Sequence, residues 1–258
     1  MITAASKLVQ WLRTARRRWW PAPPLLAAQY TLADYGRFMR EETFLYSPRY
    51  ARRLVVPHGE VHLLAAARAG GCMVCFVHYG SWILAGGAIA HRLGLPYTVI
   101  ASRRNLENLA PEEKGFWEGV HRRSRALYGH RLFYTDQSPR QALRWLKTPG
   151  HVLGVVLDVR EENRKYDEKA FRFLGHELFM QTGPARLACI AGVPMIPATI
   201  RYLPEERRHH LYFDAAVLPD GRPEDMTQRA LLAIERHVAA APQQQFYDIV
   251  AAFSRPAP

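Results

Sequence analysis

Residues 72–82 read CMVCFVHYGSW, an apolar run that ends abruptly in a histidine, a tyrosine, a glycine and a serine. Six apolar residues in succession predict a strand that is buried on both faces, as in parallel sheets, and a helix is expected over 82–93. Ligands bind beyond the carboxyl ends of parallel strands, which is where His78 would lie. The position therefore suits a catalytic histidine, although a structural histidine would also fit there.

The same alternation continues along the chain. Further helices are expected at 110–128, 138–147 and 183–191, and Ser138 is expected to cap the second of these with Pro139 at its first helical position. Upstream, residues 31–69 predict two or three helices, the last over 58–69. Together these segments predict an α/β fold with a mainly parallel central sheet flanked by helices on both faces. The expected strands are YTVIAS (97–102), RLFYT (131–135), HVLGVVLD (151–158) and PMIPATI (194–200).

The chain of 258 residues is 48% hydrophobic, enough for one large core, and its composition does not change between segments. We therefore predict a single α/β domain over 31–258, preceded by a basic amphipathic arm over 1–30. The arm carries Lys7 and four arginines with Trp19 and Trp20, and it predicts either contact with an anionic membrane surface or a helix packed on its own domain. Residues 71–90 lack charge, but His78 to Ser81 interrupt them, so no transmembrane helix is expected.

The three cysteines do not predict a disulfide framework or a metal site. Their number is odd and no secretory signal is evident, which indicates a reducing compartment. Cys72 and Cys75 stand three apart in the expected strand and should point to opposite faces as ordinary buried thiols. His209 and His210 suggest the edge of a hairpin, and no helical zinc motif is present, so no metal is expected.

The balance of 35 Lys and Arg against 23 Asp and Glu gives a formal charge of +12, which favours anionic partners. The basic residues are dispersed and no recognition motif accompanies them, which argues against nucleic-acid binding. No glycine-rich nucleotide loop is found. Four cations in predicted loops at the expected active edge of the sheet are candidates for binding phosphate, with solvated surface charge as the alternative. They are Arg103, Arg160, Arg164 and Lys165.

The turn after the first strand contributes further candidates. Gly80 would let the backbone turn sharply, and Ser81 would cap the following helix, whose first N–H groups would then face negative charge that develops beside His78. We take Tyr79, Gly80, Ser81 and Trp82 as candidate substrate-binding residues.

Several segments resemble one known family. FVHYGSW (76–82) is similar to the H-x-G-x-W-[ED] block of the late lipid A acyltransferases and the related phosphatidylinositol mannoside acyltransferases, within the lysophospholipid acyltransferase superfamily. FRFLGHELFMQTGPARLACIAGVPMIPATIRY (171–202) resembles their T-G-P segment, and Pro242 with QQQFYDIVAAFSRP (243–256) resembles their terminal block. The likeness spans roughly residues 55–256, and Thr182-Gly183-Pro184 with Pro197 is its most specific part.

The resemblance implies a glycerolipid acyltransferase-like fold and an activity. It implies that a hydroxyl or amine of a lipid or specialised biosynthetic intermediate attacks an acyl thioester of acyl carrier protein or CoA, with His78 as general base. It further implies that no acyl-enzyme intermediate forms and that no cofactor is needed. Backbone N–H groups near Gly80 to Trp82 or near Gly183 would bind the oxyanion, and Thr182 and Gly183 join the candidate substrate-binding residues. The expected location is the cytoplasmic face of the membrane, as a peripheral protein.

Two departures from the family pattern matter. The family places an acid five residues after its histidine, where this chain has Ile83. Three alternatives follow: another carboxylate orients His78, the histidine acts as a base without one, or the protein binds acyl chains or a carrier protein without transferring them. Paired terminal arginines are replaced by Ala251 and Ala252, which makes lipid A precursors doubtful acceptors. The available carboxylates are Asp158, Glu161, Glu162, Asp167 and Glu168, of which Asp158, Glu162 and Glu168 are taken as catalytic candidates.

Overall fold

The computed structural model describes residues 26–27, 29–102, 109–135, 139–160 and 168–255. The predicted arm therefore lies almost entirely outside the described residues, as do Ser138 and the candidates Arg103, Glu161, Glu162, Arg164, Lys165 and Asp167. None of the helices in the described ranges is both long and apolar enough to cross a membrane.

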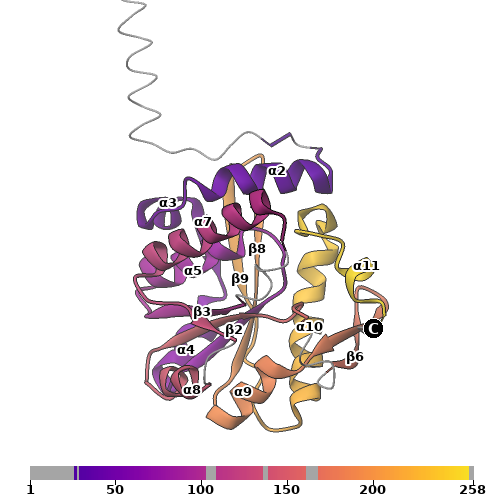
Figure 1. Ribbon diagram of the computed structural model, residues 1–258. Coiled ribbons are helices and arrows are strands. Elements are labelled where there is room, and N and C mark those ends of the chain that lie inside the picture. Colours follow the sequence, from indigo (N-terminus) through magenta and orange to yellow (C-terminus); the bar gives the residue numbers. More distant parts are fainter. Residues whose placement is uncertain (1–25, 28, 103–108, 136–138, 161–167, 256–258) are drawn as a thin grey trace, which may run out of the picture.

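The centre of the fold is a seven-stranded sheet (Figure 1) in the order β1-β9-β8-β2-β5-β3-β4. Five neighbouring strands, β8 through β4, run parallel, whereas β9 is antiparallel to β8 and β1 is parallel to β9. The mainly parallel α/β sheet is as predicted. The strands are β1 (Val55–His58), β2 (Cys72–Phe76), β3 (Tyr97–Ala101), β4 (Phe133–Tyr134), β5 (Val152–Val156), β8 (Met195–Leu203) and β9 (Arg208–Phe213).

Helices cover both faces of the sheet (Figure 1). One face packs against α3 (Pro48–Leu54), α4 (Glu60–Ala69), α5 (Trp82–His91) and α7 (Pro111–Tyr128). The other packs against α8 (Arg140–Leu146), α9 (Gly183–Ala191), α10 (Pro223–Ala239) and α11 (Ile249–Phe253), together with the hairpin β6 (Glu168–Phe173) and β7 (His176–Gln181). Helix α2 (Leu32–Thr43) packs through Tyr35, Phe38 and Met39 beside Tyr202.

Strand β2 lies in the middle of the sheet and all five of its residues are buried. Successive side chains point to opposite faces, so Cys72 and Cys75 belong to different core clusters and are free thiols, as expected. Burial raises the pKa of the Cys72 thiol to about 12. The pair is therefore structural, and the strand serves to carry His78 to the carboxyl edge of the sheet.

Three local expectations were wrong. Residues 55–58 form β1, so the helix expected from residue 58 begins at Glu60. Helix α8 begins at Arg140 with Pro139 as its cap residue instead of its first helical residue. His209 and His210 do not lie on a hairpin edge, because β1 pairs with the outer side of β9 and the buried His209 sits inside the sheet. Pro57 explains why β1 forms the edge, since proline cannot donate to a further strand.

Candidate active site

His78 and Asp158 meet at the carboxyl ends of two adjacent parallel strands. His78 follows β2, Asp158 follows β5, and the two strands pair in register. The Asp158 Oδ1 atom lies 3.1 Å from His78 Nδ1, and the backbone N–H of His78 donates to both carboxylate oxygens at 2.9 and 3.0 Å. The Asp158 carboxylate is fully buried, whereas 19% of the His78 side chain is exposed. With the proton on Nδ1 directed at this carboxylate, the ring is held in place and Nε2 is the nitrogen able to accept a proton.

A third group, Tyr247, completes this arrangement from the far end of the chain. Its single hydroxyl proton faces two acceptors on Asp158, Oδ2 at 3.0 Å and the carbonyl oxygen at 2.8 Å, and the hydroxyl oxygen lies 3.3 Å from His78 Nδ1. Burial, together with the negative charge of Asp158, raises the pKa of Tyr247, so the phenol stays protonated and donates. Sequence reasoning missed this residue, although it quoted the segment 243–256 that contains it.

The turn after His78 is fixed by close backbone contacts. Gly80 has a φ of +60°, and a Cβ there would lie 1.7 Å from the carbonyl oxygen of Ile200, so the sharp glycine turn is as expected. The Gly80 N–H donates to the Gln244 carbonyl at 2.9 Å, and the Phe246 N–H donates to the His78 carbonyl at 2.8 Å. The Gly80 N–H is therefore already bonded and Gly80 does not line the cavity, contrary to its expected place among the substrate-binding residues.

The other candidates of this turn divide between the cavity and the core. Trp82 lines the cavity beside His78, with the two rings edge to face and their centroids 4.8 Å apart. Tyr79 is buried in the core and does not line the cavity, so it was wrongly taken as a substrate contact. Ser81 is also buried away from the cavity, and its hydroxyl donates to Glu42 Oε2 at 2.9 Å instead of capping α5.

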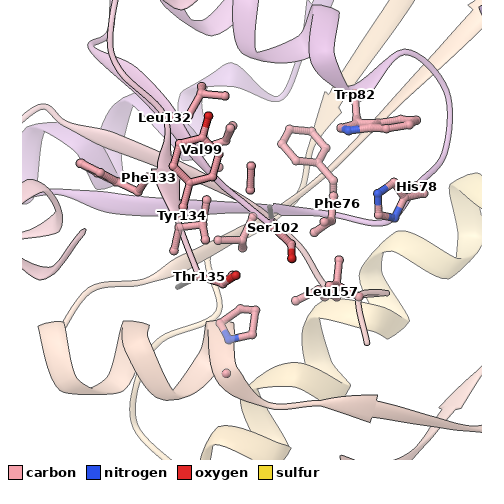
Figure 2. A pocket seen from close by; sticks show the side chains of 18 of the residues that line it. Phe76, His78, Trp82, Val99, Ser102, Leu132, Phe133, Tyr134, Thr135 and Leu157 are labelled. Carbon is pink, nitrogen blue, oxygen red and sulfur yellow. The ribbon is translucent and has the colours of Figure 1, made fainter. Parts of the chain in front are cut away.

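The site opens into a mainly apolar cavity of about 830 Å³. Figure 2 shows His78 at one end of this cavity, near Trp82 and Phe76, with Leu132 and Phe133 at the other. The strand order from β2 to β4 covers three strand spacings, or roughly 14 Å along the carboxyl edge. The cavity borders both faces of the sheet: Val99, Val120, Tyr128 and Leu132 belong to the α5/α7 side, and Ile100, Phe133, Ala142 and Leu187 to the α8/α9 side.

Arg160 and Glu168 form a structural pair on the cavity rim. Arg160 Nε donates to Glu168 Oε1 at 2.7 Å, and its remaining nitrogens donate to the carbonyls of Phe179, Ala252 and Arg255. Glu168 therefore forms a salt bridge with Arg160 and is not the carboxylate beside His78. Its position does not support the catalytic role expected for it. Arg160 lines the cavity but its donors hold the C-terminal segment in place.

The T-G-P segment begins α9. Gly183 and Pro184 line the cavity, whereas Thr182 is buried and does not. Among the described ranges, no group of three or more histidine, cysteine or acidic side chains is placed to hold a metal ion.

Comparison with known proteins identifies the family of this chain. The family model described as bacterial lipid A biosynthesis acyltransferase matches residues 27–247, which covers most of the chain and includes His78, Asp158 and Tyr247. A search of the curated proteins found no match. This chain therefore belongs to the bacterial lipid A biosynthesis acyltransferase family and is an acyltransferase.

Proposed function

We propose that this acyltransferase transfers an acyl chain from a thioester, on acyl carrier protein or CoA, to a hydroxyl or amine of a lipid or specialised biosynthetic intermediate, with His78 as general base. The observation that carries the proposal is the His78–Asp158 pair at the end of an apolar cavity. An acyl chain needs an apolar pocket, and a neutral imidazole held through Nδ1 can accept a proton at Nε2.

The geometry supports the following reaction. His78 Nε2 accepts the proton of the acceptor hydroxyl or amine as that oxygen or nitrogen bonds to the thioester carbonyl carbon. The resulting tetrahedral oxyanion collapses, the carbon–sulfur bond breaks, and the imidazolium returns the proton to the thiolate. Asp158 stays ionised and stabilises the imidazolium between these steps. The first N–H groups of α5, at Trp82 and Ile83, have no carbonyl partner within the helix and support an oxyanion site at this end of the cavity.

The acceptor is proposed to differ from a lipid A precursor. Ala252 lines the cavity, and Ala251 is exposed beside it, where the related sequences carry a pair of arginines. Alanine side chains at these positions cannot form the bidentate hydrogen bonds by which arginines bind the phosphate of a glycolipid. The basic residues and tryptophans of the N-terminal sequence support action at the cytoplasmic surface of the membrane.

Binding of an acyl chain without transfer was the alternative raised by Ile83. That alternative rested on the absence of a carboxylate partner for His78 at position 83. In the structure Asp158 lies within hydrogen-bond distance of the His78 ring. This contact favours transfer.

The direct test is an acyl-transfer assay. Purified full-length protein is incubated with acyl-CoA or acyl-carrier-protein thioesters of several chain lengths and with lysophospholipid, glycolipid or amine acceptors, and products are identified by mass spectrometry. We expect an acylated acceptor to accumulate together with free thiol. Release of thiol at the spontaneous rate with no acylated product from any pair would contradict the proposal.

Ile83→Glu is expected to lower the rate of transfer roughly tenfold or more, because a second carboxylate would be buried in the apolar wall of the cavity that Asp158 also lines. Ile83 is only 7% exposed and lines the cavity. The measurement is kcat at saturating thioester, with Ile83→Leu as the control that keeps the wall apolar. A faster Ile83→Glu enzyme would show instead that the helix position still serves the histidine.

A further inference from the structure

Glu42, near the end of α2, is a fully buried carboxylate with four hydrogen-bond donors around it. Its oxygens accept from Tyr50 at 2.7 Å, Ser81 at 2.9 Å, Tyr46 at 3.2 Å and His209 Nε2 at 2.6 Å. Burial opposes the charge, but the positive charge of His209 and the donated hydrogen bonds outweigh it, so the pKa of Glu42 is lowered. The chain therefore keeps an ionised carboxylate in its core, although burying a charge is costly.

One of the four donors belongs to the turn that carries His78. Ser81 is the cap residue of α5, and a serine there would ordinarily accept a hydrogen bond from the N–H of Ile83 or Leu84. It does not, because its hydroxyl is turned toward Glu42. The same chain does use such caps elsewhere: Thr31 accepts from the Asp34 N–H and Ser47 accepts from the Tyr50 N–H.

The diversion of Ser81 leaves the start of α5 uncapped at the active site. Leu84 N–H is bonded to the Ser81 carbonyl at 2.8 Å, whereas Trp82 and Ile83, the first two residues of the helix, form part of the cavity wall next to His78. A serine hydroxyl in the capping position would occupy the Ile83 N–H that the proposed oxyanion needs.

We propose that Glu42 is a positioning residue, which holds the Ser81 hydroxyl away from the end of α5 and so keeps the first N–H groups of that helix open beside His78. This inference rests on the proposed function. Glu42 acts from a different helix, through a side chain that does not touch the cavity.

The test compares substitutions that release Ser81 with one that retains it. Glu42→Met has similar volume and no strong acceptor, so Ser81 is free to cap α5, and we expect kcat to fall about 100-fold, the loss typical of one oxyanion donor. The KM for the thioester and the pKa read from the pH profile of kcat/KM should stay unchanged, because His78 and Asp158 are untouched. In Glu42→Gln the amide donates to Ser81 and keeps the hydroxyl in place, so kcat should be largely retained.

A second substitution separates positioning from simple damage. In Glu42→Met/Ser81→Ala no hydroxyl remains to cap the helix, and we expect kcat to recover by at least about tenfold over Glu42→Met. A merely structural role of Glu42 predicts no recovery. If unpaired His209 prevents folding, both substitutions are made in a His209→Leu background, because replacing both members of a buried polar pair by apolar residues is often tolerated.

The outcomes are distinct. A double variant as slow as Glu42→Met, or a Glu42→Met enzyme with unchanged kcat, would overturn this inference while leaving the proposed function standing. A wild-type protein that transfers no acyl group in the same assay would overturn the proposed function, and this inference with it.

Discussion

His78→Ala is expected to lower kcat for acyl transfer by about 10²- to 10⁴-fold, the usual contribution of a general base. Among the described residues that line the cavity, only His78 has a ring whose Nδ1 contacts a buried carboxylate and whose Nε2 has no such partner. The fold should be retained, because the side chain is partly exposed and packs mainly through its edge-to-face contact with Trp82. The measurement is kcat with a saturating thioester, alongside the circular dichroism spectrum and the melting temperature.

The matched control is His62→Ala, which removes an exposed histidine on α4, away from the cavity. Its turnover should equal that of the wild type. Wild-type turnover in folded His78→Ala would exclude the histidine as the base and would show that another group takes the proton of the acceptor.

Asp158→Asn is expected to reduce kcat on a similar scale, about 10²- to 10⁴-fold, because an amide neither stabilises the imidazolium nor fixes the Nδ1–H tautomer as a carboxylate does. Three donors converge on this carboxylate, from the His78 backbone, the His78 ring and the Tyr247 hydroxyl. Asparagine would turn its own N–H₂ group toward one of them. The measurement is kcat at saturating thioester, beside the circular dichroism spectrum that checks the fold.

Two further substitutions test whether Asp158 is the carboxylate that acts with His78. Glu168→Gln changes a carboxylate that pairs with Arg160 and should slow transfer far less than Asp158→Asn. Tyr247→Phe removes one donor and keeps the charge of the aspartate, so an intermediate loss is expected. A Glu168→Gln enzyme slower than Asp158→Asn would reverse the assignment of the acid.

The sequence was sufficient to predict that His78 lies at the carboxyl edge of the sheet. Strand β2 carries an unbroken apolar run, and His78 and Asp158 stand just beyond the ends of β2 and β5, so parallel pairing brings them together. The sequence could not choose Asp158 over the neighbouring acids, because that choice depends on which side chain points back across the strand ends. Tyr247 and Glu42 join the site through tertiary contacts at separations of 169 and 39 residues, which no local pattern encodes.

The missed elements have separate reasons. Strand β1 is four residues long and includes a proline, so its pattern is too short to distinguish from a loop. The β6–β7 hairpin turns at Leu174 and Gly175, both with positive φ, and leucine is an unusual residue for such a turn. Helix α10, in contrast, could have been predicted from its own residues, with Pro223, Glu224 and Asp225 in its first turn and Arg236 and His237 in its last.

The return of residues 244–247 to the His78 turn separates the formation of the sheet from the support of the His78–Asp158 pair. Gln244, Phe246 and Tyr247 hold the backbone at Gly80, the backbone at His78 and the Asp158 carboxylate, although most of the sheet is encoded before residue 214. All seven strands of the sheet therefore precede these three supports along the chain. A variant truncated before residue 244 is expected to pair its sheet while His78 and Asp158 lack their support, and so to be folded in outline yet inactive.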